Sequence, residues 1–371
     1  MWTQIHRRTL LRGSLATVAG LCARCLVAQE AARAADPDCH RCRGLGLVPL
    51  TNPKPYVFVE GQGAFKPDEA AVGQPCPLCQ VAGDTKALAV EAERQHAAVL
   101  AEHALWEERL DEKLLLVQTR HVAIHTELKP ADAKRMGEAV EEMAFRLQRA
   151  AGSLAITPTR PAGYPQMLLW GEDSWKKFRE VMERHYTPEQ LGDDWQNAGK
   201  GILYDHAAVA HCYLTPKTAR EVPPEYFAVK LAAARQIWVA SGLHAPPWLI
   251  EGFAGYAQHL VLRAARVFTI YAQGRGPGRP VTLKDAAQAA AAKQFRPWDK
   301  MLTRPLRDIE PADYAQSLAM VAFLMDDQPA KFVRFVALLQ LGAACPAALE
   351  EAYGKSISDL EAASARWLAR R

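Results

Sequence analysis

Two Cys-x-x-Cys pairs near the start of the chain restrict its folding more than any other feature of the sequence. Cys39 and Cys42 form the first pair, Cys76 and Cys79 form the second, and 33 residues separate the pairs. Four thiolates arranged tetrahedrally suit Zn²⁺, and such a closed site has no open position for a substrate. We therefore predict a structural, four-cysteine zinc site that ties two distant segments together.

The residues after the first pair strengthen this prediction. The sequence continues as Cys-x-x-Cys-x-Gly-x-Gly through Gly44 and Gly46, and it resembles the zinc knuckles of DnaJ-type chaperones. Glycines at these positions let backbone amides turn toward the sulfurs. The second pair lacks this spacing, and the intervening loop is longer than in a usual zinc ribbon. Two structural disulfides, or a chaperone-like or redox use of the thiols, stay open as alternatives.

Charge argues against a polyanion-binding protein. The chain has 45 Lys and Arg residues and 41 Asp and Glu residues. Five of the basic residues and one of the acidic residues lie within residues 1–34, which leaves 40 of each beyond them. We therefore expect no nucleic acid partner. No later stretch approaches the roughly 20 unbroken apolar residues of a membrane span, so we expect none after signal cleavage.

Residues 1–34 have the pattern of an export signal. Arg7-Arg8 precedes a weakly apolar stretch, and Ala32-Arg33-Ala34 offers a small-x-small cleavage site. This pattern predicts a twin-arginine-type signal peptide and an exported protein, periplasmic or extracellular. A basic, unstructured N-terminus on a cytoplasmic protein is the alternative, and Arg24 within the apolar stretch favours it.

The remaining chain is divided by its changes in composition and periodicity. We predict a cysteine-rich, zinc-ribbon-like module over 35–84, a connecting helix over 85–112, and one large domain over 113–371. Within the large domain we expect a strand over 114–126, a helix over 130–151, strands over 166–170 and 201–213, and helices beyond Pro223. Strands early and helices late indicate an α+β fold.

Two helices opened by proline pairs follow Pro223 and Pro246. The second reads Trp-Leu-x-Glu-Gly-x-Ala-x-Tyr from Trp248 and resembles the third-ligand helix of gluzincin zinc peptidases, more narrowly the peptidase MA-like domains of unknown function. This resemblance covers about residues 113–371. It implies a zincin-like fold, with a small mixed sheet and a largely helical C-terminal half, and it makes Glu251 the counterpart of the third zinc ligand.

The sequence departs from that family where its chemistry resides. The preceding helix should carry His-Glu-x-x-His, two zinc-binding histidines and a catalytic base. Aligned on Gln236-Ile237-Trp238, Leu231 and Arg235 replace the two histidines, and Ala232 replaces the base. Leucine and a guanidinium do not bind zinc, and alanine cannot move a proton. The alignment therefore implies that these are degenerate active-site positions, with no catalytic residue and no catalytic metal.

Two hypotheses concern the space between these helices. Arg235 and Glu251 could form an ion pair that replaces the metal and links the helices. Alternatively, Arg235 reaches solvent and Glu251 caps a backbone group. A relocated metal site built from His206 or His211 with Glu251 stays open, although the spacing of these residues is not a ligand signature.

The function that these observations favour is binding rather than catalysis. In active relatives the cleft holds an extended peptide against an edge strand, and this mode of binding needs no metal. We therefore expect an exported, catalytically inactive peptidase-like scaffold for an unknown protein or peptide. A zinc metallohydrolase with relocated ligands is one alternative, and a chaperone-like or redox module that uses the cysteine pairs is the other.

Overall fold

The computed structural model defines which parts of the chain are described below. The described residues are 36, 39, 42, 44–49, 55–76, 79, 83–151, 166–170, 172–185, 187–188, 201–204, 209–213, 222–242, 244–266, 280–305 and 308–371. The predicted signal peptide lies outside them, and the predicted boundaries at residues 34, 84 and 112 stay predictions.

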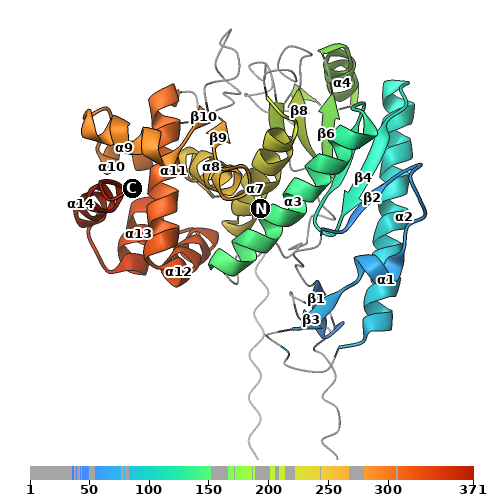
Figure 1. The fold of residues 1–371 in the computed structure, drawn as a ribbon, viewed down its shortest axis with the longest axis horizontal. Helices are drawn as coiled ribbons and strands as arrows, with labels where there is room; N and C mark the ends of the chain where they lie inside the picture. Colours follow the sequence, from blue (N-terminus) through green and yellow to red (C-terminus); the bar gives the residue numbers. More distant parts are fainter. Residues whose placement is uncertain are drawn as a thin grey trace, which may run out of the picture. The chain divides into compact units, whose positions relative to one another are not determined.

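A six-stranded mixed sheet forms from the apolar and β-branched segments of the first 213 residues (Figure 1). In spatial order its strands are β2 (Val57–Val59), β4 (Leu115–Thr119), β5 (Ala123–Thr126), β6 (Gln166–Trp170), β8 (Val209–Tyr213) and β7 (Gly201–Tyr204). The central strands β5, β6 and β8 run parallel, and the other pairings are antiparallel. Together with the helices around it, this sheet confirms the α+β class.

The predicted strand over 114–126 was wrong in detail, because it contains a turn, and the predicted strand segment over 201–213 contributes two strands. The segment 114–126 forms the hairpin β4–β5, and the segment 201–213 forms β7 and β8. In the first case the Thr119 hydroxyl oxygen accepts hydrogen bonds from the backbone N–H groups of His121 and Val122, at 3.0 and 3.1 Å. This side-chain turn competes with continued pairing, so the chain reverses there.

The segment between the two cysteine pairs does more than connect them. It contributes β2, which pairs with β4 at the edge of the main sheet. It also contains β1 (Leu47–Pro49), α1 (Pro67–Ala70) and β3 (Gly73–Pro75). β1 and β3 form a separate antiparallel ribbon. The cysteine-rich segment is therefore continuous with the main sheet through one strand.

Helices cover both faces of the sheet. Val99 of α2 (Thr85–Leu110) clusters with Leu116 and Ala123. On the other face, α3 (Pro130–Ala151) approaches so closely at Gly137 that an added Cβ would lie 3.1 Å from Val117 Cγ1. Because successive strand residues point to opposite faces, α2 and α3 lie on opposite sides. α4 (Glu172–His185) packs beside α2.

The predicted helix pair is confirmed as α7 (Glu225–Ala240) and α8 (Pro247–Leu262). α8 carries apolar residues around its whole circumference, which is typical of a helix with no solvent-facing side. It packs between α7, α3 and α11 (Pro311–Asp327). Trp248, Leu249 and Phe253 are fully buried there, so α8 forms the centre of the helical half.

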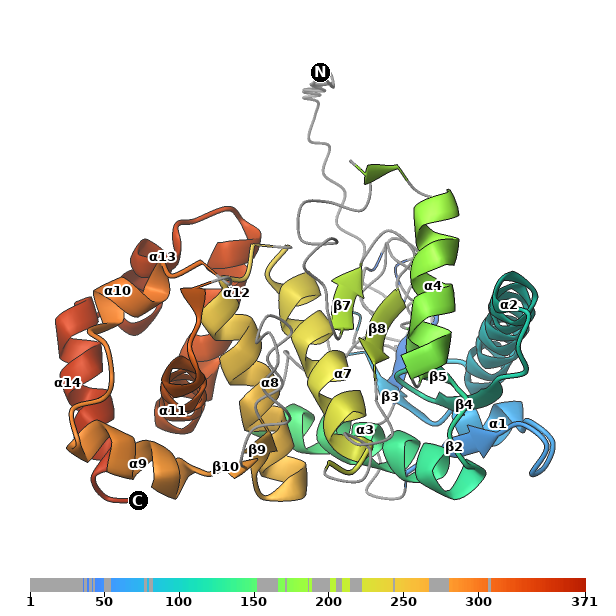
Figure 2. The same ribbon diagram turned by 90° about the horizontal axis from the view of Figure 1, so that it is seen from above.

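The remaining helices follow the short ribbon of β9 (Ala265–Arg266) and β10 (Pro280–Val281), and several of them pack around α11 (orange to red in Figure 1, and from above in Figure 2). They are α9 (Leu283–Ala291), α10 (Trp298–Leu302), α12 (Pro329–Gln340), α13 (Cys345–Tyr353) and α14 (Ile357–Leu368). Among the described helices, none combines the length and apolar character needed to cross a membrane.

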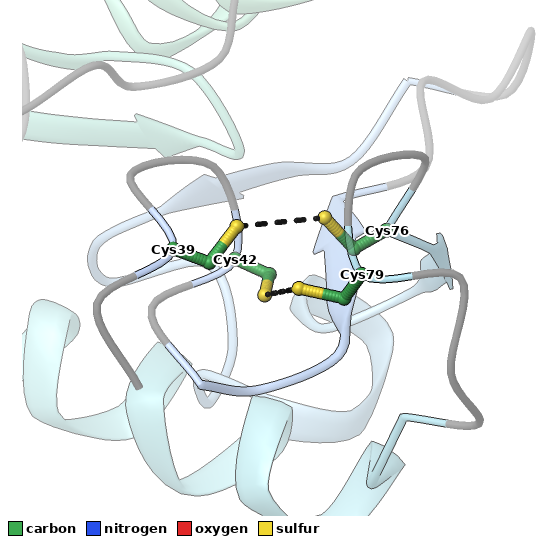
Figure 3. A group of neighbouring side chains, drawn as sticks. All are labelled: Cys39, Cys42, Cys76 and Cys79. Carbon is green, nitrogen blue, oxygen red and sulfur yellow. Dashed lines mark hydrogen bonds between the residues drawn. The ribbon is translucent and has the colours of Figure 1, made fainter. Parts of the chain in front are cut away.

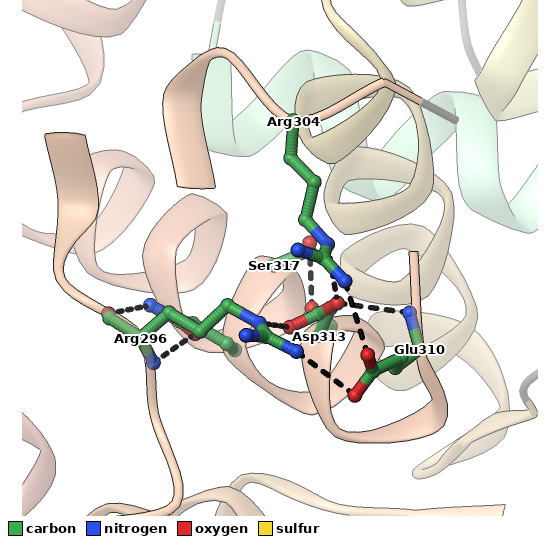
Figure 4. A network of polar contacts seen from close by, with 6 residues as sticks. Arg296, Arg304, Glu310, Asp313 and Ser317 are labelled. Carbon is green, nitrogen blue, oxygen red and sulfur yellow. Dashed lines mark hydrogen bonds and ion pairs between the residues drawn. The ribbon is translucent and has the colours of Figure 1, made fainter. Parts of the chain in front are cut away.

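A buried carboxylate fixes the start of α11 (Figure 4). Asp313 is 1% exposed, and its two oxygens lie 2.9 Å from Arg296 Nε and 3.0 Å from Arg304 Nε. The same carboxylate accepts the backbone N–H of Glu310 in a capping box, and Glu310 pairs with both arginines. Two arginines from the chain before α11 are thereby held at its first turn.

The close contact of α8 with α11 gives a stability test at two glycines of one helix. An added Cβ at Gly252 would lie 2.4 Å from the backbone oxygen of Ser317, whereas at Gly255 its nearest neighbour would be Ala265 Cβ at 3.5 Å. We expect Gly252→Ala to lower the free energy of unfolding by about 1–3 kcal/mol through overpacking. Gly255→Ala should leave it unchanged or raise it by up to about 1 kcal/mol, since alanine favours helix. Urea denaturation measures both, and equal effects would contradict the close contact.

Candidate metal centre

Backbone geometry at the first cysteine pair explains the two glycines of its motif. Gly44 and Gly46 have φ values of 78° and 69°, in the left-handed region that favours glycine. The turn closes with a hydrogen bond from Leu45 N to Cys42 O at 3.0 Å, and the backbone N–H of Gly46 bonds to the Cys42 sulfur. The predicted role of the glycines, to turn amides toward sulfur, is confirmed at this position.

The second cysteine pair is held against the first by backbone pairing. β3 leads directly into Cys76, whose N–H donates to Gly46 O at 2.7 Å. Beyond Cys79, Asp84 N lies 3.3 Å from Leu45 O, and the Asp84 side chain then caps α2. The turn that follows the first pair therefore touches the chain on both sides of the second pair.

The four sulfur atoms converge, as the sequence predicted (Figure 3). Cys39 Sγ lies 3.9 Å from Cys76 Sγ, Cys42 Sγ lies 3.4 Å from Cys79 Sγ, and all four lie within 4.8 Å of one another. Zinc–sulfur bonds of about 2.3 Å in a regular tetrahedron place the sulfurs about 3.8 Å apart. The side chains present therefore fit one tetrahedral ion such as Zn²⁺. In the described part of the chain, no other group of His, Cys, Asp and Glu side chains has this property.

Electrostatics couples cation binding at these sulfurs to the loss of protons. Burial raises the pKa of the Cys42 and Cys79 thiols above the ordinary value, while hydrogen bonds from the backbone amides of Gly46 and Asp36 act in the opposite direction. Four thiolates this close repel one another unless a cation lies between them. Metal binding must therefore displace protons from the thiols, so the affinity for the ion falls as the pH falls.

In the helix pair α7 and α8, the charged partner of Glu251 differs from the one that the sequence predicted. Lys230 Nζ of α7 lies 2.7 Å from Glu251 Oε2 of α8, and both side chains are buried. The Lys230 ammonium also lies 5.8 Å from the ring centre of Tyr314 on α11. The hypothesis that Arg235 is the partner of Glu251 was wrong, because the Glu251 carboxylate pairs with the Lys230 ammonium instead. The alternative, in which Glu251 caps a backbone group, was also wrong, because its carboxylate accepts a hydrogen bond from Lys230 Nζ.

The degenerate positions offer no metal ligands. Leu231, Ala232 and Arg235 all lie on α7, and Leu231 and Arg235 are buried. Glu251 would be the one ligand type among the four, and its carboxylate is held by the Lys230 ammonium. These residues do not fit a catalytic zinc. His206 and the side chain of His211 lie outside the described residues, so the relocated site stays a hypothesis.

A buried carboxylate that sequence reasoning missed holds the β4–β5 turn. Glu141 of α3 is fully buried, and its Oε1 lies 2.7 Å from His121 Nδ1 and accepts the Arg120 backbone N–H at 2.8 Å. The Arg120 guanidinium is 3.6 Å from Oε2. Burial tends to raise the pKa of Glu141, but the charges of His121 and Arg120 and the hydrogen bonds outweigh it and lower the pKa. Its position on the apolar stripe of α3 was the available signal.

A second pair of side chains that the sequence did not reveal joins α2 to β5. His103 Nδ1 lies 2.8 Å from His125 Nδ1, and the two buried rings are stacked. The other nitrogen of His103 faces Glu60 at 3.2 Å. One imidazole must donate and the other must accept, so both rings cannot be protonated at Nδ1. We interpret this pair as a polar contact within the core.

Comparison with known proteins leaves the family open. No family model matches the chain, and no curated protein sequence is significantly similar to it. The likeness to gluzincins therefore rests on the sequence pattern of residues 113–371 alone.

The Glu141 cluster gives a prediction about acid stability. Since its folded-state pKa lies below the unfolded value of about 4.3, the ionised carboxylate stabilises the fold above that pH, and this stabilisation is lost as the pH falls through the folded pKa. Glu141→Gln should cost about 3–5 kcal/mol at pH 7 and flatten the acid limb of the stability curve.

Glu142→Gln is the matched control, because it changes the next residue of the same helix. Glu142 pairs at the surface with Arg146, four residues further on, and such pairs contribute about 0.3–0.5 kcal/mol. Denaturant unfolding between pH 3 and pH 7 measures both variants. Curves for Glu141→Gln that keep the full acid slope of the wild type would show that Glu141 does not carry it.

Proposed function

We propose that this chain is an exported, non-catalytic relative of zincin peptidases that binds a peptide or protein. A structural zinc ion at the four cysteines is part of the proposal. The observation that carries the proposal is the buried ion pair between Lys230 and Glu251. In a gluzincin the glutamate at this position would coordinate a metal. Here an ammonium supplies the positive charge that the buried carboxylate requires.

Three features support a zincin-like arrangement. All six strands of the mixed sheet precede α7 and α8 in the chain, these two helices are neighbours, and Glu251 directs its carboxylate toward α7. Leu231, Ala232 and Arg235 then stand where hydrolysis would require two ligands and a base. A scaffold of this kind keeps its fold without its chemistry, because the lysine replaces the charge of the metal and not its Lewis acidity.

Peptide binding is proposed because of the edge of the sheet. Among the described strands, β7 is the last on its side and pairs only with β8. An extended peptide can pair with such an edge through backbone hydrogen bonds, and this needs no catalytic group. The four-cysteine centre is proposed to hold Zn²⁺ as a structural ion, since a set of four thiolates suits zinc and leaves no position for a substrate. Export through the twin-arginine pattern of residues 1–34 is part of the same proposal.

The ion pair and the absence of hydrolysis can be tested together. Lys230→Met should destabilise the protein by about 3–5 kcal/mol because it leaves a buried carboxylate without a cation. Lys230→Met combined with Glu251→Leu should recover most of that loss, since an apolar pair of similar volume needs no compensation. Thermal or denaturant unfolding of the single and double variants completes the cycle.

The wild type and a Glu251→Gln variant, both loaded with zinc, are then incubated with a diverse peptide mixture. Mass spectrometry identifies the peptides that stay bound and any that are cleaved. The wild type should bind peptides without cleaving them, and Glu251→Gln should behave in the same way. Cleavage by the wild type that disappears in Glu251→Gln would contradict the proposal and favour the metallohydrolase with relocated ligands.

A further inference from the structure

Two sulfur contacts in the four-cysteine centre run across the Cys-x-x-Cys pairs, and Cys42 also interacts with Cys39 of its own pair. Cys39 faces Cys76 and Cys42 faces Cys79, each over 37 residues of sequence (Figure 3). The contacts arise because backbone bonds, such as Cys76 N–H to Gly46 O, hold the turns of the two pairs against each other. Each cysteine therefore has a prospective disulfide partner in the other pair.

The sulfur atoms of each cross-pair contact need to move only a short distance to form a disulfide. The sulfur atoms are 3.9 and 3.4 Å apart, and a disulfide bond is about 2.05 Å long, so each contact must shorten by about 1.4–1.9 Å. Rotation of a cysteine side chain between staggered rotamers moves its sulfur atom by distances of this order. The two cross-pair disulfides would also link the two turns covalently, whereas a disulfide within each pair would not.

We propose that the centre is an oxidation site for a peroxide-class oxidant, and that it exchanges its metal for the disulfides Cys39–Cys76 and Cys42–Cys79. The inference rests on the proposed zinc-binding function. In each half-reaction a thiolate attacks a peroxide oxygen to give a sulfenic acid, and the facing thiolate displaces that oxygen to form the disulfide. Two molecules of hydrogen peroxide take four electrons from four thiolates and, with four protons, become four waters, while Zn²⁺ is released.

Exposure sets the order of the two steps. Cys79 is half-buried, whereas Cys39, Cys42 and Cys76 are buried. An oxidant from solvent therefore reaches Cys79 first, and the sulfur facing it belongs to Cys42. The first disulfide is accordingly Cys42–Cys79, and the second follows as the ion leaves. The two disulfides would therefore keep the cysteine turns covalently linked after the ion is lost in an oxidising compartment.

The test uses the zinc-loaded mature protein with Cys345 changed to serine, which removes a thiol outside the centre. Cys345 is a suitable residue to change because burial raises its pKa to about 12, which marks an unreactive thiol. Hydrogen peroxide is added stepwise, a chromogenic chelator reports released zinc, and free thiols are alkylated before digestion without reduction. Trypsin cuts after Arg41 and separates the first two cysteines, and chymotrypsin cuts after Leu78 and separates the other two.

We expect one zinc released and two disulfides formed per chain, with Cys42–Cys79 dominant after the first equivalent of peroxide. Linkages of Cys39 to Cys42 or of Cys76 to Cys79 would overturn the inference while leaving zinc binding intact. Protein purified without zinc would instead contradict the proposed metal function, and the linkages formed by its thiols would still decide between cross-pair and within-pair oxidation.

Two double variants provide a second readout that does not depend on the metal. With Cys42 and Cys79 changed to serine, Cys39 and Cys76 remain and should oxidise to one disulfide. With Cys76 and Cys79 changed to serine, Cys39 and Cys42 are the cysteines of the centre that remain, and their disulfide should form more slowly than the cross-pair disulfide. Equal rates in the two variants would contradict the preference for cross-pair closure.

Discussion

The convergence of four thiols, three of them buried, is the constraint on which the N-terminal part of this protein depends. The segment between the cysteine pairs shares a small core with α2, in which Leu47 and Ala71 of the segment and Leu88 of α2 are the buried members. So little apolar burial does not by itself offset the entropy of ordering such a segment. A cation held by the four sulfur atoms, as proposed, would stabilise this segment, because it would close the loop and join it to the start of α2. The edge strand β2 then reaches the main sheet from a segment that is anchored on both sides.

A second constraint governs the helical half, where a carboxylate is buried in an apolar environment. α8 is covered on all sides, so the ionised Glu251 needs a positive charge within reach. A metal ion would meet this need in a zincin, and the Lys230 ammonium meets it here. Gly252, the next residue, permits the backbone of α11 to approach. The Glu-Gly pair thus serves charge compensation at one residue and close helix packing at the next, and neither requires catalysis.

Sequence reasoning located those features that are encoded locally. The cysteine pairs with their glycines predicted the sulfur cluster, and the proline-bounded apolar runs predicted α3, α7 and α8. It failed where a local side-chain turn or a contact between residues far apart in the chain decides the outcome. The hairpin at Thr119 was missed because an apolar run hides a side-chain turn, and the choice of Lys230 over Arg235 depends on how two helices are rotated against each other. The Glu141 cluster was missed because its partners lie in that same unpredicted turn.

The central claim, that a single ion is held by four sulfurs and by no residue of the helix pair, is tested most directly by zinc X-ray absorption spectroscopy of the purified protein. We predict a first shell of four sulfur atoms at about 2.3 Å and no nitrogen or oxygen ligand. The spectrum should be unchanged in Glu251→Gln and should vanish when Cys39, Cys42, Cys76 and Cys79 are replaced by serine. Ligands at about 2.0–2.1 Å, from histidine nitrogen or carboxylate oxygen, would contradict the claim and indicate a metal site elsewhere in the chain.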